Sequence, residues 1–437
     1  MVFLNGAPFK FATKVGGLHK GYVYATAFSP NGDHLVTVGA DKRIQLYDGK
    51  TGEPTKEIGQ GEHTGSIFSV SWSSDSKKFV TASADQTVRV WDIESGKSVQ
   101  TWKFGGDSAI SIMDQQVGVV WPASRSDGLI ISLNLAGDLI YLNEGKPDPA
   151  KIVQGHNRSI TAIGYSTTND KPTLFTGSFE GRVCSWDLSS GTATAIDGQT
   201  HTNQVSAFTT TPTHTYSVGW DDTLRPIDPS TSTFLGTSQK LKAQPKGITF
   251  LPTSNTLYIA TTTAIETFQN DQALATFPIK EYTPTCLASS KQVIAVGADN
   301  NNLYIYTPDF SLLKTLSKST APLTSLSFSP TSTLLAAGNS SGKIVVYDTT
   351  TWEVVTDRWS AHTARITSLA WNAAGTHAAS ASLDTNIHVW SLEKPGKRVK
   401  AANAHKEGVN GVVWWGERVV SVGGDAAVKV WRVEGLV

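Results

Sequence analysis

A short aromatic–polar ending closes one β-rich segment after another along this chain. The strong endings are Tyr47-Asp48, Trp91-Asp92, Trp186-Asp187, Tyr347-Asp348, Trp390-Ser391 and Trp431-Arg432. Weaker endings fit between them at Tyr141, Ile227, Phe268 and Tyr306. Ten segments of roughly 40 residues result, and a fixed period of this length indicates that each segment is one unit of a repeated structure.

The segment from His63 to Asp92 shows the design of one unit. Phe68, Val70 and Trp72 alternate with serines, which predicts a strand. Residues 79–83 form the next predicted strand, residues 84–86 a tight turn, and residues 87–91 a returning strand. A histidine start, a Trp-Asp end and this strand pattern are typical of WD-repeat propeller blades.

The number of units predicts the domain organisation. Because a closed propeller holds about 4 to 8 blades, ten units require two rings or one ring and a fragment. Lys146-Pro147-Asp148-Pro149 reads as a linker, since prolines disfavour strand pairing. We therefore expect an all-β protein with a partial propeller of three WD-type blades at residues 1–148 and a complete seven-bladed WD-repeat propeller at residues 149–437. The last unit needs an outer strand from upstream, and we expect residues 151–154 to supply it.

The composition narrows the classes of partner. Lys plus Arg and Asp plus Glu are both 37, so no net charge attracts nucleic acid or an anionic membrane. The longest apolar runs have the length of strands, and no membrane helix is expected. Cys184 and Cys286 are the only cysteines, which fits a reducing cytoplasmic setting without disulfides. We expect a monomer with no metal and no cofactor.

Several units repeat a histidine, a turn aspartate and a closing aromatic residue at nearly constant spacing. The sets are His63, Asp85 and Trp91; His362, Asp384 and Trp390; His405, Asp425 and Trp431; and, in the first unit, His19, Asp41 and Tyr47. With a nearby Ser or Thr, such a set suggests a catalytic triad. A set that recurs in four units fits better a buried hydrogen-bond network that holds each blade together. We therefore predict that the protein is not an enzyme. Glu180 replaces the turn aspartate in one unit, where we expect a looser blade.

Three less regular stretches add a resemblance to a known family. They are Pro8-Phe9-Lys10-Phe11, the segment Asp114-Gln115-Gln116-Val117-Gly118-Val119-Val120-Trp121, and Trp220-Asp221-Asp222-Thr223-Leu224. With them the chain resembles the actin-interacting protein 1 family over essentially its whole length. The resemblance implies two seven-bladed propellers, of which ten blades are represented here and the first four are absent.

The resemblance also implies a function. Members of the family bind actin filaments decorated with cofilin and promote their disassembly, so actin filaments and cofilin are the expected partners and the cortical actin cytoskeleton the expected location. Phe11 and Tyr22 match aromatic positions that contribute to this binding, although either side chain could instead pack between blades. The alternative function is a generic WD-repeat interaction scaffold, such as a ubiquitin-ligase substrate adaptor.

Overall fold

The fold is β throughout, as predicted. The computed structural model describes residues 18–105, 111–122, 124–125, 127–166, 172–236 and 238–434. Among them the only helix is a single 3-10 turn, η1 (Ile112–Asp114). The strands form ten antiparallel sheets, one for each repeated segment. The chain divides into two compact units, Met1–Gln154 and Gly155–Val437.

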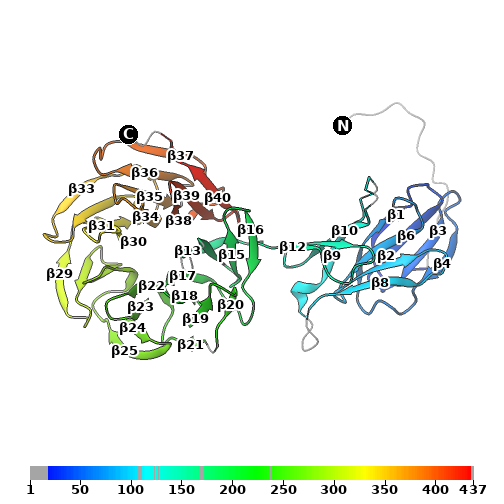
Figure 1. Ribbon diagram of the computed structural model, residues 1–437, viewed down its shortest axis with the longest axis horizontal. Coiled ribbons are helices and arrows are strands. Elements are labelled where there is room, and N and C mark those ends of the chain that lie inside the picture. Colours follow the sequence, from blue (N-terminus) through cyan, green and yellow to red (C-terminus); the bar gives the residue numbers. More distant parts are fainter. Residues whose placement is uncertain are drawn as a thin grey trace. The chain divides into compact units, whose positions relative to one another are not determined.

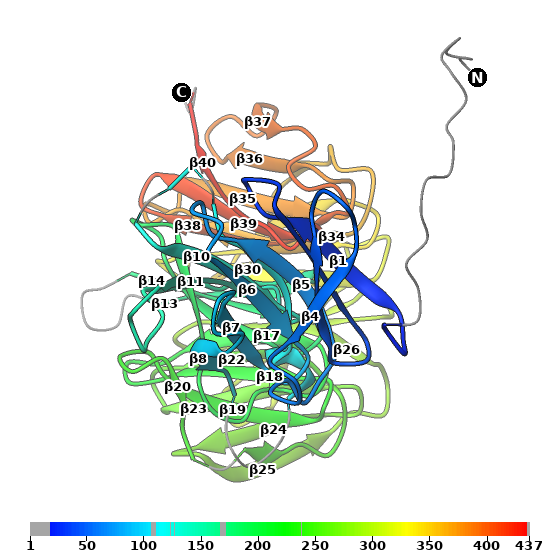
Figure 2. The ribbon, with the colours of Figure 1, turned by 90° about the vertical axis from the view of Figure 1, so that its right-hand side faces the viewer.

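The first unit contains three four-stranded sheets, drawn in blue and cyan in Figures 1 and 2. Their inner strands, β1, β5 and β9, pack side by side in chain order, and each pair of neighbouring sheets encloses an apolar core. The strands are β1 (Val23–Phe28), β2 (His34–Gly39), β3 (Ile44–Asp48), β4 (Pro54–Ile58); β5 (Ile67–Trp72), β6 (Lys78–Ser83), β7 (Thr87–Asp92), β8 (Ser98–Lys103); and β9 (Gln116–Val120), β10 (Leu129–Asn134), β11 (Leu139–Asn143), β12 (Lys151–Val153).

The second unit is a ring of seven sheets around a central axis (Figure 1). The innermost strand of its last sheet, β38, packs against that of its first, β13, and so closes the ring. The strands are β13 (Ile160–Ser166), β14 (Thr173–Ser178), β15 (Val183–Asp187), β16 (Thr192–Ala195); β17 (Val205–Thr210), β18 (Thr215–Gly219), β19 (Thr223–Asp228), β20 (Thr233–Phe234), β21 (Gln239–Lys240); β22 (Pro245–Leu251), β23 (Thr256–Thr261), β24 (Ala264–Gln269), β25 (Gln272–Pro278); β26 (Pro284–Ser289), β27 (Ile294–Ala298), β28 (Leu303–Tyr306), β29 (Leu312–Leu316); β30 (Leu323–Phe328), β31 (Leu334–Asn339), β32 (Ile344–Asp348), β33 (Val354–Trp359); β34 (Ile366–Trp371), β35 (His377–Ser382), β36 (Ile387–Ser391), β37 (Arg398–Ala401); and β38 (Val409–Trp415), β39 (Arg418–Gly423), β40 (Val428–Arg432).

The second sheet shows why this sequence forms a blade. Strands β5, β6 and β7 match the three segments predicted from the alternating pattern. The turn between β6 and β7 needs a left-handed residue, and Gln86 adopts a φ of 67° there. The Asp85 carboxylate holds the turn by accepting hydrogen bonds from the Thr87 N–H (3.0 Å) and hydroxyl (2.6 Å). Phe79 and Val80 are buried on the two faces of β6, so the sheet packs against a neighbour on each side.

The predicted repeat endings, strong and weak, all lie in the third strand of a sheet. Even the weak endings Tyr141, Ile227, Phe268 and Tyr306 lie in β11, β19, β24 and β28. The irregular third segment therefore still forms a complete blade. The number of units predicted from the sequence is confirmed.

The predicted closure of the last blade is wrong. β12 does not join the last sheet; it pairs with β11 of its own blade, with Lys151 opposite Tyr141 and Val153 opposite Leu139. The Ala150 N–H donates to the Tyr141 carbonyl at 2.8 Å, so the short connection after Asn143 returns the chain directly to β11. The units consequently divide after residue 154, and not after residue 148. The last sheet has three strands, and β40 is its outer edge within the described residues.

A β-bulge near the start of every inner strand gives the second unit a ring of hydrogen bonds between sheets. In six of the seven sheets the side chain of the bulge residue donates a hydrogen bond to the next sheet. The acceptor is the backbone carbonyl of the residue just before the bulge in that next sheet. The bonds run from Thr161 to Val205 (2.7 Å), Ser206 to Pro245 (3.3 Å), Thr285 to Leu323 (2.7 Å), Thr324 to Ile366 (2.6 Å), Thr367 to Val409 (2.5 Å) and Asn410 to Ile160 (2.7 Å). All six side chains donate in the same sense around the ring.

The first unit is an open arc. Its three bulge residues are Tyr24, Phe68 and Val117, none of which has the short hydroxyl or amide side chain that makes these bonds in the second unit. Apolar side chains remain exposed on the first and third sheets, where no neighbouring sheet covers them among the described residues. They are Val23, Tyr24 and Phe28 on the first sheet and Val120, Leu133, Leu139 and Ile152 on the third.

Candidate functional site

The histidine sets identified in the sequence come together as hydrogen-bonded networks. In the sheet of β34–β37, Nδ1 of His362 lies 2.9 Å from the Asp384 carboxylate and Nε2 lies 2.8 Å from the Ser380 hydroxyl. The indole N–H of Trp390 donates to the same hydroxyl at 2.8 Å. The chain of four side chains thus ties the loop before β34 to the turn after β35 and to the closing aromatic residue.

The same arrangement recurs in other sheets. His19 contacts Asp41 (2.9 Å) and Thr37 (2.8 Å); His63 contacts Asp85 (2.8 Å) and Thr81 (2.8 Å), with Trp91 donating to Thr81 (2.8 Å); His405 contacts Asp425 (2.5 Å) and Ser421 (2.8 Å), with Trp431 donating to Ser421 (2.8 Å).

A further network was missed from the sequence. His201 contacts Asp221 (2.9 Å) and Ser217 (2.9 Å). The closing residue of this unit is Ile227 instead of an aromatic residue, so the sequence motif was incomplete there. The spacing of 20 residues from His201 to Asp221 equals that from His405 to Asp425, and this signal could have revealed it.

Burial fits a structural role for these networks. The Thr81, Ser217, Ser380 and Ser421 hydroxyls belong to residues with no exposed surface, so no substrate can reach them in the closed blade. Burial lowers the pKa of His362 and of His405, although the facing carboxylates act in the opposite direction. Burial would raise the pKa of Asp85, but hydrogen bonds from His63, Thr87 and the Thr64 backbone outweigh it and hold that pKa below its ordinary value. These groups hold one another in place.

The network is incomplete where Glu180 replaces the turn aspartate. His156 keeps its bond to Thr176 (2.7 Å), but Glu180 pairs with Arg158 (3.5 Å) instead. His156 Nδ1 is buried and has no hydrogen-bond partner among the described residues. Burial, and then the charge of Arg182, lower the pKa of His156 to about 4.

Removing one network histidine should destabilise the second unit. We expect His362→Ala to lower the free energy of unfolding by about 1–3 kcal/mol, because the buried Asp384 and Ser380 lose their shared partner. Urea denaturation followed by tryptophan fluorescence measures the change. The control is His377→Ala in the same sheet, since His377 is only half-buried and lies outside the network. Equal losses in both variants would contradict a structural role for the network.

Tyr22 is the exposed aromatic residue that the sequence singled out. Its side chain is 80% exposed and lies just before β1. The loop is fixed by Asp41, which accepts a hydrogen bond from the Lys20 N–H at 2.7 Å, and by the Ala40 N–H, which donates to the Tyr22 carbonyl at 2.8 Å. Gly39 permits this approach, because a Cβ there would lie 2.3 Å from the Tyr22 carbonyl oxygen. A rigid loop thus presents an exposed ring, whereas Phe11 lies outside the described residues.

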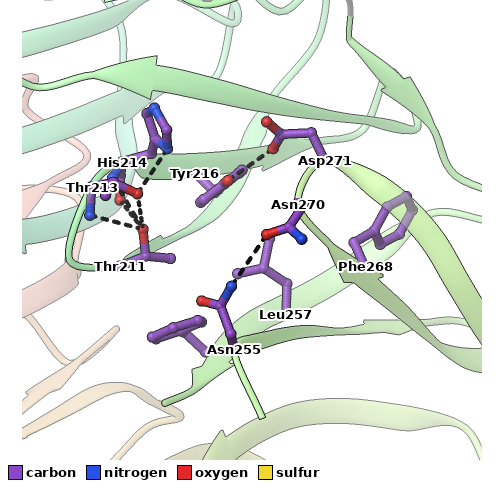
Figure 3. Close-up of a pocket in the computed structure, with 10 residues that line it drawn as sticks. Thr211, Thr213, His214, Tyr216, Asn255, Leu257, Phe268, Asn270 and Asp271 are labelled. Atoms are coloured by element: carbon purple, nitrogen blue, oxygen red, sulfur yellow. Dashed lines mark hydrogen bonds between the residues drawn. The ribbon is translucent and has the colours of Figure 1, made fainter. Parts of the chain in front are cut away.

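The second unit has a small pocket between two of its sheets (Figure 3). Its volume is about 240 Å³. The polar groups around it are paired with one another, as in the bonds from the Tyr216 hydroxyl to Asp271 (2.8 Å) and from Asn255 to Asn270 (3.3 Å). Asn255, Asn270 and Asp271 have left-handed backbones typical of tight turns. The pocket is a hollow between turns, and its polar groups hydrogen-bond one another.

Across the described ranges, no three His, Cys, Asp or Glu side chains gather in a way that could hold a metal ion. None of the helical structure in those ranges is long and apolar enough to cross a membrane.

Comparisons with known proteins agree with this architecture. The WD domain, G-beta repeat, matches residues 14–48, 53–92 and 147–187, and the Vps8 beta-propeller matches residues 274–435. The repeated sheets, their His–Asp–Ser/Thr–Trp networks and these matches define a WD-repeat β-propeller protein.

Relatives identify the family within that class. An uncharacterized WD repeat-containing protein of Schizosaccharomyces pombe is 41% identical over 99% of this chain and 71% of its own length. Actin-interacting protein 1 of Drosophila melanogaster is 33% identical over 99% of this chain and 70% of its own length. WD repeat-containing protein 1 of Gallus gallus is 30% identical over 99% of this chain and 71% of its own length. The chain belongs to the actin-interacting protein 1 family, which confirms the resemblance found in the sequence.

Proposed function

We propose that this protein binds actin filaments together with cofilin and promotes their disassembly without catalysing a covalent reaction. The observation that carries the proposal is the identity to actin-interacting protein 1 across nearly the whole chain. The exposed and rigidly held Tyr22 supports it, because it is an accessible aromatic residue at a position that binds in the resembled family. Aromatic side chains of this kind are frequent anchors of protein interfaces.

The proposed mechanism is a shift of populations. A protein that binds a cofilin-distorted filament more tightly than an undistorted one stabilises the distorted state, and disassembly follows from the strain in that state. The protein needs a rigid surface for this, and Tyr22 is held on such a surface by the His19–Asp41 network. The proposal places the protein in the cytoplasm, at cortical actin structures, as a monomer. It makes the first unit the partial propeller that carries the filament surface and the second unit the complete one.

Truncation of Tyr22 tests the proposal. We expect Tyr22→Ala to weaken co-sedimentation with cofilin-decorated actin filaments about thirtyfold, since loss of a central aromatic anchor costs about 2 kcal/mol or more. The matched control is Phe28→Ala, which removes an exposed aromatic residue at the other end of β1. Thermal melts check that both variants fold. If both bind as the unaltered chain does, or if that chain does not co-sediment with decorated filaments, the proposed function is wrong.

A further inference from the structure

One position of the second unit breaks the hydrogen-bond ring around the central axis. The bulge residue of β22 is Lys246, where the other six sheets have Thr, Ser or Asn. Its ammonium group bonds the Gln244 side-chain oxygen at 2.8 Å and lies 5.5 Å from the centre of the Trp220 ring. A long cationic side chain therefore occupies the place of a short hydroxyl, at the end of the ring where the inner strands begin.

A second cation lies on the same end of the ring. Arg365 is exposed and directly precedes β34. Burial, and then the charge of Arg365, lower the pKa of Lys246. Among the described residues, neither side chain forms an ion pair with a carboxylate within 4 Å. Two cations on one end of the ring without a carboxylate partner favour the binding of an anion there.

Exposed apolar side chains lie on the same end of the ring as these cations. Phe179, Trp220 and Leu383 occupy equivalent positions in three turns between second and third strands, and they are 51%, 39% and 47% exposed. Backbone bonds tie these turns to the residues just before the inner strands, from Phe179 to Ser159 (2.9 Å), Trp220 to Gln204 (2.8 Å) and Leu383 to Arg365 (3.1 Å). We call the set of Phe179, Trp220, Lys246, Arg365 and Leu383 the cationic face.

We propose that the cationic face of the second unit binds a carboxylate-rich segment of a partner protein that also carries an apolar side chain. Lys246 and Arg365 supply the charge that a carboxylate complements, and Trp220 supplies a flat apolar wall beside Lys246. The apolar rim favours a peptide over a small inorganic anion, because an inorganic anion would leave Phe179 and Leu383 exposed. This site lies on the second unit and is independent of the filament surface proposed around Tyr22.

The test uses the full chain and short fluorescent peptides. The probe is a peptide of glutamates around one phenylalanine, compared with an all-glutamate peptide and with a peptide of lysines around one phenylalanine. We expect salt-sensitive binding of the first peptide, weaker binding of the second and none of the third. Fluorescence anisotropy measures the dissociation constants.

Two variants locate the site. Lys246→Thr gives this sheet a threonine, the residue found at four other bulges. Its hydroxyl would face the Pro284 carbonyl, which lies just before the bulge of the next sheet and corresponds to the acceptors of the other six bonds. This substitution should lower affinity for the probe about tenfold or more while the melting temperature stays equal or rises. Arg365→Gln should also weaken binding. The control is Lys291→Thr, at an exposed residue of the turn between β26 and β27.

Specific outcomes overturn the proposal. It is wrong if the unaltered chain does not bind the glutamate–phenylalanine peptide, or if Lys246→Thr binds it as tightly as Lys291→Thr does. It is also wrong if inorganic phosphate at equal concentration displaces the peptide completely, since the site would then recognise a small anion. None of these results depends on actin, so they are distinguishable from a failure of the proposed function.

Discussion

Trypsin should cut the first unit at least about tenfold faster than the second, because an open arc with uncovered apolar faces opens more readily than a closed ring. Among the described residues no sheet covers the exposed apolar side chains at the two ends of the arc, such as Phe28 and Val120, so they lack the packing that a neighbouring sheet gives. In the second unit each sheet has a neighbour on both sides, and six side chains bond one sheet to the next.

Two cleavage sites provide a matched comparison. Lys78 begins β6 in the first unit, and Arg418 begins β39 in the second, each opposite the last residue of the third strand. Mass spectrometry of the early fragments should find the cut at Lys78 first, even though Arg418 is the more exposed of the two. Equal rates at the two sites would show that the arc is covered as well as the ring.

Acidification should unfold the second unit well before the carboxylates of its networks titrate. Burial, then the charges of His362 and Arg398, lower the pKa of His388 to about 3, and the pKa of His156 is about 4. Both values lie below the ordinary value of about 6.5, so the folded state binds fewer protons than the unfolded state. Their contribution to stability is fully present above pH ~6.5 and is lost as the pH falls toward these folded values.

The expected loss in the free energy of unfolding is large for a change of pH alone. Between about pH 6 and 4 each of the two imidazoles lowers the free energy of unfolding by up to about 1.4 kcal/mol per pH unit. Asp425, whose pKa is about 2, adds a loss at still lower pH, because burial is outweighed there by bonds from Lys429 and His405. Urea denaturation at several pH values measures the slope, and His388→Gln should reduce it. An unchanged stability from pH 7 to 4 would show that these histidines are not held neutral by the fold.

The blade count and strand order were predictable because they depend on local sequence. A closing aromatic and an alternating inner strand recur even where the motif weakens to Ile227 or Phe268. The position of the outer strand β12 was predicted wrongly. The sequence repeat runs from a histidine to a tryptophan, and it does not show whether the strand before the histidine belongs to the preceding blade or to another one.

The candidate sites were only partly predictable. The exposure of Tyr22 depends on the loop before β1, which the Asp41 carboxylate and the Ala40 N–H hold in place and which the residue pattern does not specify. Lys246 could not be identified from the sequence as equivalent to Thr161 and Thr285. The equivalence depends on a β-bulge, which is a feature of strand register that the residue pattern does not show. The role of Phe11 stays a prediction.

The bond from Asn410 to the Ile160 carbonyl joins residues that are 250 positions apart in the chain. The other five links of the ring join sheets that follow one another in sequence, so they can form as each new sheet docks on the previous one. The Asn410 link forms only when the last sheet meets the first, and contacts between such distant residues form slowly. If the sheets dock in chain order, the second unit is stacked but unclosed until this link forms, and its first and last sheets are both uncovered in that state. In that state it resembles the arc of the first unit, and the time spent there sets how long the ring is open to mispairing and aggregation.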